Sequence, residues 1–213
     1  MSSTPPSPGF ADPAGTWNRR FSAPGYLFGT EPNAWLHAHA DVWDAGRRVL
    51  CVADGEGGNS VFLAQRGLPV DAFDIAEVGV RKARDFARIT GVKVNFAVSD
   101  IATLQWPESL YDGVAAIFIQ FADPQLRMRI FEGIVRCLKP GGTLVLQGYT
   151  PKQLDYGTGG PPVASHMYTP QLLREAFQAM EILELREYEA ELAEGTAHKG
   201  YSALVGMVAR KRA

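Results

Sequence analysis

The stretch Arg47–Asn59, RRVLCVADGEGGN, decides the fold of this chain. Residues 47–53 form a short apolar run, and a glycine-rich segment follows directly. This pattern predicts a buried strand that turns into a helix beginning near Asn59. A ligand can approach such a turn closely only where side chains are absent, as at Gly55 and Gly57, and the first turn of the helix presents free N–H groups. An ordinary glycine-rich connection would look the same, so the loop alone does not define a site.

Strand and helix patterns alternate along most of the remaining chain, which indicates a mostly parallel sheet with helices on both faces. The strands are expected at 47–53, 69–74, 92–98, 111–119, 143–147, 181–189 and 201–210, and the helices at 59–65, 77–89, 127–138 and 170–180. The loop between the last two strands is too short for a crossover helix, so these strands should be antiparallel. The predicted fold is therefore α/β, a Rossmann-like, doubly wound, seven-stranded sheet with an antiparallel edge hairpin.

Within the helix expected at 77–89, four apolar residues are spaced to form one buried face. They are Val78, Ala83, Phe86 and Ile89.

Length and composition indicate a single globular domain. The chain has 213 residues, 46% of them hydrophobic and 21% charged, and a net charge of -2. The Ser- and Pro-rich residues 1–15 suggest a flexible N-terminal arm, and residues 16–213 suggest a single domain. The bulk charge gives no reason to expect nucleic acid as a partner. The oligomeric state cannot be predicted from the sequence.

Cysteine usage and hydropathy point to the cytoplasm. Cys51 and Cys137 both lie inside apolar runs, which fits a reducing compartment better than a disulfide framework. No spacing of Cys and His suggests a metal site, so none is expected. The N-terminus lacks the features of a signal peptide, and no apolar run is long enough to span a membrane.

Two further polar sites follow consecutive predicted strands. Asp74 ends the second strand, where doubly wound sheets hold ribose hydroxyls, and Ser99-Asp100-Ile101 follows the third. Taken alone, Asp74 could cap the next helix and Asp100 could be a loop residue. Because ligands bind at the carboxyl ends of such strands, the three sites together indicate one nucleoside-type ligand.

At this point the chain resembles class I S-adenosylmethionine-dependent methyltransferases over about residues 15–210. The resemblance lies in the order of VLCVADGEGGNSVFLAQRG, VDAFDIAEVGVRKA, VSDIATL and LKPGGTLVLQGYTP. Within that class, GEGGNS, RRFSAPGYLFGTEPN and GTGGPP look most like the tellurite-resistance and thiopurine methyltransferase branch.

The resemblance implies S-adenosylmethionine as cofactor. Gly55 and Gly57 would pack against its methionine part, Asp74 would hold the ribose, and Asp100 with the Ile101 backbone would hold the adenine. The full set of expected cofactor residues is Asp54, Gly55, Gly57, Asn59, Asp74, Ile75, Ser99, Asp100, Ile101, Phe118 and Ile119. The chain departs from the pattern at Cys51, where an acid is usual, and at Ala53, where a glycine is usual. Asp54 would then face the ammonium group of the cofactor.

Sequence signals are weaker for the residues that would contact the methyl acceptor. Five residues are candidates for a lid or a substrate wall: Trp17, Arg20, Phe21, Tyr26 and Phe121. The opening segment, which also holds Phe28, could equally be packing. The catalytic candidates are Gln120, His198 and Tyr149, although a lone loop histidine is more often a surface residue.

The predicted function is methyl transfer from S-adenosylmethionine to a small-molecule acceptor, with a soft nucleophile of the S, Se or Te type favoured because no motif supplies a strong base. A non-catalytic S-adenosylmethionine-binding module is one alternative. An NAD-dependent oxidoreductase is another, but its fingerprint calls for Gly or Ala where this chain has Ser60.

Overall fold

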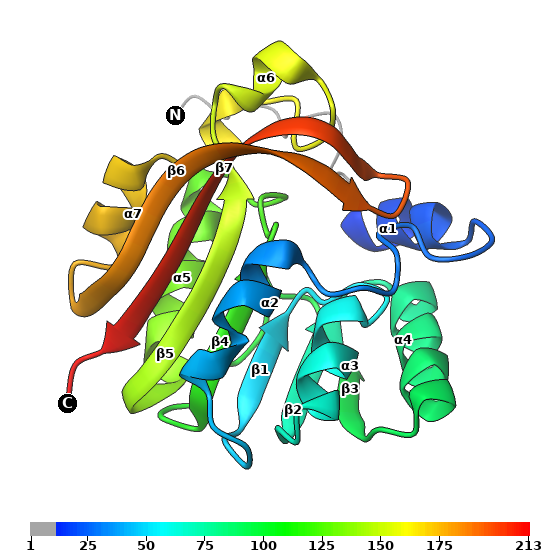
Figure 1. The fold of residues 1–213 in the computed structure, drawn as a ribbon, viewed down its shortest axis with the longest axis horizontal. Helices are drawn as coiled ribbons and strands as arrows, with labels where there is room; N and C mark the ends of the chain where they lie inside the picture. The colour runs from blue at the N-terminus through cyan, green and yellow to red at the C-terminus, as the bar shows by residue number, and fades with distance from the viewer. Residues whose placement is uncertain (1–11) are drawn as a thin grey trace.

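The computed structural model describes residues 12–213, and its centre is one seven-stranded sheet in the order β3-β2-β1-β4-β5-β7-β6 (Figure 1). The strands are β1 (Val49–Val52), β2 (Val70–Asp74), β3 (Val94–Val98), β4 (Tyr111–Ile117), β5 (Leu138–Tyr149), β6 (Met180–Glu194) and β7 (His198–Lys211). The first five strands pair in parallel, while β7 is antiparallel to both β5 and β6. The predicted fold class is confirmed.

Helices cover both faces of the sheet (Figure 1). The α-helices are α1 (Pro13–Phe21), α2 (Ala34–His39), α3 (Gly58–Gln65), α4 (Glu77–Thr90), α5 (Pro124–Cys137), α6 (Gln153–Tyr156) and α7 (Pro170–Ala176). One hydrophobic core lies under α5 and α7, and it includes Phe131, Ile134 and Leu173. A second core lies under α2 and α3, and it includes Leu36 and Leu63. No helix between residues 12 and 213 has the length and apolar character needed to cross a bilayer.

Helix boundaries follow local capping. Helix α5 begins at Pro124, three residues before the expected start, because the Asp123 side chain accepts from the N–H of Leu126 and proline suits the first turn. The expected buried face of α4 is wrong in part: Ile89 is 71% exposed, and the buried residues are Gly79, Val80, Ala83 and Ala87. The helix is rotated from the predicted face because glycine and alanine allow close packing there.

Near the two ends of the chain, the helices and strands differ from expectation mainly in their bounds. Helix α7 stops at Ala176, and β6 and β7 extend to a three-residue turn, so His198 begins a strand instead of lying in a loop. Pro13, Ala14 and Gly15, placed in the expected arm, belong to α1. Residues 1–11 of that arm lie outside the described residues. The two free cysteines, Cys51 and Cys137, are both buried.

Tryptophan rings pack directly on strand glycines. A Cβ built on Gly206 of β7 would lie 2.4 Å from the Trp35 ring, and one on Gly113 of β4 would lie 2.2 Å from Trp43 Nε1. Both tryptophans are buried, so neither ring has free space to move into. These two glycines therefore fix how closely α2 and the segment after it approach the sheet.

We predict that Gly206→Ala lowers the free energy of unfolding by about 1–3 kcal/mol, because overpacking forces the Trp35 ring to shift. Urea unfolding checks the value. The double variant Gly206→Ala/Trp35→Phe should lose less than the sum of the two single variants, since the smaller ring leaves room for the methyl group. Strict additivity would show that the contact is not tight.

Candidate functional site

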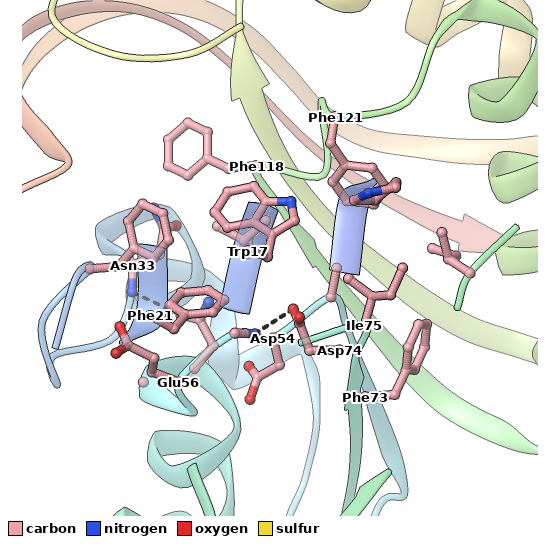
Figure 2. Close-up of a pocket in the computed structure, with 18 of the residues that line it drawn as sticks. Trp17, Phe21, Asn33, Asp54, Glu56, Phe73, Asp74, Ile75, Phe118 and Phe121 are labelled. Carbon is pink, nitrogen blue, oxygen red and sulfur yellow. Dashed lines mark hydrogen bonds between the residues drawn. The ribbon is translucent and has the colours of Figure 1, made fainter. Parts of the chain in front are cut away.

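A cavity of about 390 Å³ lies at the carboxyl ends of β1, β2, β3 and β4. The loops after these strands form its floor, and α1 with the tip of the β6–β7 hairpin closes one side. Figure 2 shows Trp17 and Phe21 over the carboxylates of Asp54 and Asp74. The volume is in the range of small-molecule sites.

The loop after β1 is held by Asp74. The Gly55 N–H donates to Asp74 Oδ2 at 3.0 Å, and the Ala76 N–H donates to Asp74 Oδ1 at 2.8 Å. Each carboxylate oxygen can accept more than one hydrogen bond, so the buried Asp74 retains acceptor capacity toward the cavity. Ala53, at the usual first-glycine position, has a φ of 49°, a conformation that favours glycine.

Asp54 has an unusual environment for a carboxylate. Ser60 Oγ donates to Asp54 Oδ2 at 2.5 Å, and the Ser60 N–H donates to Oδ1 at 3.3 Å. Burial raises the pKa of Asp54 to about 7, and the nearby Asp74 charge adds to the effect, although the Ser60 hydrogen bonds oppose it. An ionised Asp54 is therefore a charge that a bound cation would stabilise.

The lining of the cavity is strongly acidic. Carboxylates come from Glu31, Asp54, Glu56, Asp74, Asp100, Asp123 and Glu194. Among residues 12–213, no Lys or Arg side chain lines the cavity. Glu56 is neutralised from behind by Lys82, at 2.8 Å. The remaining charges favour a ligand that carries positive charge and oppose an anionic one.

The opening segment is held against the loop after β1. Phe21 is buried, and a Cβ on Gly55 or Gly79 would contact its ring at 3.2 and 3.0 Å. The Leu27 N–H donates to Glu56 Oε2 at 2.6 Å, and Lys82 Nζ donates to the carbonyls of Ala23 and Gly25. This segment is therefore both packed on the domain and part of the cavity wall.

His198 lies in an aromatic box at the other end of the wall. Its ring centroid is 4.4 Å from that of Phe28, 4.5 Å from that of Phe118 and 5.8 Å from that of Tyr149. Its Nδ1 is 3.3 Å from Glu194 Oε2, and both side chains line the cavity. Phe118 has a φ of 52°, a strained conformation of a kind that clusters at functional sites.

The structure brings most of the expected site residues together. Those that line the cavity are Trp17, Phe21, Asp54, Gly55, Asn59, Asp74, Ile75, Ser99, Asp100, Ile101, Phe118, Phe121 and His198. Those that do not are Arg20, Tyr26, Gly57, Ile119, Gln120 and Tyr149. The residues of the second set are outside the lining for different physical reasons.

Gly57 faces a helix instead of the cavity. A Cβ there would lie 2.9 Å from the Ala83 Cβ of α4, so Gly57 allows close helix packing and does not line the cavity. Ile119 is buried in the core under α5. Both positions were expected to touch the ligand because the resemblance to the methyltransferase class implied it.

Gln120 and Tyr149 are tied to each other. Gln120 Nε2 donates to the Tyr149 carbonyl at 2.8 Å, and Gln120 Oε1 accepts from the Tyr149 N–H at 2.6 Å. These bonds join the ends of β4 and β5 and occupy the Gln120 amide. The Tyr149 ring is buried beneath Phe118, and burial raises the pKa of its hydroxyl, which makes it a poor proton acceptor near neutral pH.

Arg20 and Tyr26 lie on the outer side of the wall. The Arg20 guanidinium stacks on Trp17 at 4.4 Å from the ring centroid, and Tyr26 packs against Phe86 of α4. Both support the wall from behind.

Several cavity residues were absent from the expected set of site residues, among them Phe28, Asn33, His166 and Glu194. Phe28 belongs to the aromatic opening segment, and Glu194 precedes His198 by four positions, so these two carried a weak sequence signal. Asn33 and His166 stand in no pattern. Among residues 12–213, no group of three or more His, Cys, Asp or Glu could hold a metal ion.

Residues 49–142 match a protein family described as a methyltransferase domain. A search of the curated proteins found no match. Among solved structures, a SAM-dependent methyltransferase from Methanosarcina mazei aligns with a TM-score of 0.69 and 22% identity over 85% of this chain and 99% of its own. TehB from Haemophilus influenzae aligns with a TM-score of 0.69 and 18% identity over 93% of this chain and 67% of its own.

A third structure comes from work on the conversion of a disulfide bond into a thioacetal group during echinomycin biosynthesis. It aligns with a TM-score of 0.76 and 16% identity over 93% of this chain and 92% of its own. The family match supports the predicted class, an S-adenosylmethionine-dependent methyltransferase, over residues 49–142 and implies S-adenosylmethionine as the cofactor, and the solved structures share the fold.

We predict that Asp54→Asn stabilises the ligand-free protein at pH 8 and has little effect at pH 4. The pKa of Asp54 is higher in the folded protein than in the unfolded chain, so ionisation favours the unfolded state as the pH rises from about 4 to about 7. Asparagine removes this penalty and keeps an acceptor for Ser60. Denaturant unfolding at both pH values checks the difference. An equal effect at both would show that Asp54 has an ordinary pKa.

Proposed function

We propose that the cavity binds S-adenosylmethionine and that the chain transfers its methyl group to a small, uncharged or cationic molecule with a soft nucleophile. The observation that carries the proposal is the acidic lining at the ends of three parallel strands. S-Adenosylmethionine carries a sulfonium and an ammonium group, so its charge complements these carboxylates. The sulfonium makes the methyl group a strong electrophile, and the protein mainly orients the two reactants.

The residues fit this cofactor. Asp74 would accept from ribose hydroxyls with the acceptor capacity left by Gly55 and Ala76, and Asp100 with the Ile101 backbone would hold the adenine. Asp54 is placed to receive the ammonium group, taking the part of the acid that Cys51 replaces. Trp17 and Phe21 would exclude water from the bound cofactor.

The same charges disfavour the oxidoreductase alternative. A dinucleotide brings a diphosphate, and no Lys or Arg among residues 12–213 lines the cavity to receive it. The non-catalytic alternative is disfavoured by the second half of the cavity, where Phe28, Glu194 and His198 form walls that belong to none of the expected cofactor contacts.

The charge of the lining also bears on the acceptor. Oxyanions such as tellurite would be repelled by Glu31 and Glu194, whereas an uncharged thiol would not be. Within the branch that the motifs resemble, we therefore favour the thiopurine type of acceptor, a ring-bearing thiol, over tellurite. A cytoplasmic location, and a small molecule instead of a nucleic acid as partner, complete the proposal.

We predict that calorimetry detects binding of S-adenosylhomocysteine and no binding of NAD, because only the first is compatible with the acidic lining. Methylation of thiophenol should be detectable, and methylation of tellurite should not. Binding of NAD without S-adenosylhomocysteine would refute the proposal, and binding of S-adenosylhomocysteine without transfer to any thiol would favour the non-catalytic alternative.

We predict that Asp74→Ala weakens S-adenosylhomocysteine binding by about 1.5–3 kcal/mol, the size of charge-assisted hydrogen bonds. Asp71→Asn, on the same strand but paired with Arg48 away from the cavity, is the matched control and should bind as the native protein does. Equal affinities for all three proteins would mean that Asp74 only shapes the loop.

A further inference from the structure

The pair formed by His198 and Glu194 lines the same cavity as the residues expected to hold the cofactor. The two residues face each other across the turn of the β6–β7 hairpin, and their side chains are 14% and 15% exposed. A carboxylate can only accept a hydrogen bond, so the proton between them is on His198 Nδ1. Nε2 is therefore the ring nitrogen that carries the free lone pair when the ring is neutral.

Glu194 is itself held in place from the other side. Asn33 Nδ2 donates to Glu194 Oε1 at 2.7 Å and to Gln147 Oε1 at 2.6 Å, and Gln147 Nε2 donates to the Tyr188 hydroxyl. The Asn33 N–H donates to Asn59 Oδ1 at 2.9 Å, at the start of α3. One asparagine thus links the His198–Glu194 pair to the loop that would bind the cofactor.

The environment of the His198–Glu194 pair differs from that of an ordinary surface ion pair. In the described chain, the ion pair of Glu194 is with His198, and no Lys or Arg neutralises it. Phe28 and Phe118 enclose the imidazole ring from two sides. A protonated His198 would be stabilised by Glu194, so the pair can accept a proton without leaving a charge unpaired.

We propose that His198 Nε2 is the general base that removes the proton of the methyl acceptor, and that Glu194 is its positioning residue. This inference rests on the proposed function and adds that the acceptor is protic, with an ionisable S–H or O–H group. The acceptor atom forms a bond to the methyl carbon, the bond from that carbon to the cofactor sulfur breaks with its electron pair left on sulfur, and the acceptor proton passes to His198. The imidazolium then returns the proton to solvent.

The proposal changes what the acceptor must be. A soft nucleophile was expected as the acceptor because the motifs contain no strong base. The structure supplies a candidate base in His198. General base catalysis matters most for acceptors that remain protonated at the assay pH and little for those already ionised. The importance of His198 should therefore depend on the acidity of the acceptor.

The test compares two thiols at pH 7, benzyl mercaptan, which is mostly protonated, and 4-nitrothiophenol, which is mostly ionised. Each loss is taken relative to the native protein with the same thiol, so that repulsion of the ionised thiol by the acidic lining cancels. His198→Gln should lower kcat/KM for benzyl mercaptan by about 100-fold or more and for 4-nitrothiophenol by less than about 3-fold. Glu194→Gln should follow the same pattern with smaller losses. His37→Gln, at an exposed histidine stacked on Phe62, is the matched control and should change neither value.

A second readout does not depend on turnover. Nitrogen-15 NMR of the histidine rings should show the neutral His198 ring protonated at Nδ1, with the Nδ1 signal altered in Glu194→Gln. Equal losses for both thiols, or a neutral His198 protonated at Nε2, would overturn the proposal. So would transfer to neither thiol by a protein that binds S-adenosylhomocysteine. If S-adenosylhomocysteine does not bind the native protein at all, the proposed function fails first.

Discussion

The parallel pairing of β1 with β2 on one side and β4 on the other is the constraint on which the rest of the structure depends. Cys51 is in register with Ala72 of β2 and with Ala115 of β4, so the three strands end at one edge of the sheet. Asp54, Asp74 and Phe118 come within two residues of those ends and must therefore meet. Parallel strands need crossover connections, and the helices that provide them cover both faces and leave this edge open.

The acidity of that edge costs stability before a ligand binds. Burial raises the pKa values of both Asp54 and Asp74, which means that the fold disfavours their ionised forms. Lys82 offsets the negative charge of Glu56 only. Its ammonium group also donates to the carbonyls of Ala23 and Gly25 and so holds the opening segment. A cationic ligand would relieve the repulsion among the remaining carboxylates, so its binding would stabilise the folded protein.

The fold and about half of the site were predictable because they depend on local pattern. Apolar runs that end in glycine or aspartate predicted the strands. The candidate ligand residues were predicted because they follow the ends of those strands. Gly57 and Gln120 do not line the cavity, and sequence does not reveal which way a loop residue faces, toward Ala83 in one case and the Tyr149 backbone in the other. Asn33 and Glu194 are 161 positions apart, and no local pattern predicts such a contact.

Both proposals require one arrangement, a cofactor held by the ends of β1, β2 and β3 with its reactive end toward the His198–Glu194 pair. A crystal structure of the protein with S-adenosylhomocysteine is the most direct measurement. We expect the ribose hydroxyls at Asp74, the amino group at Asp54 and the sulfur facing the space enclosed by Phe28, Phe118 and His198. A ligand with its sulfur turned away from His198, or one bound outside this cavity, would contradict it.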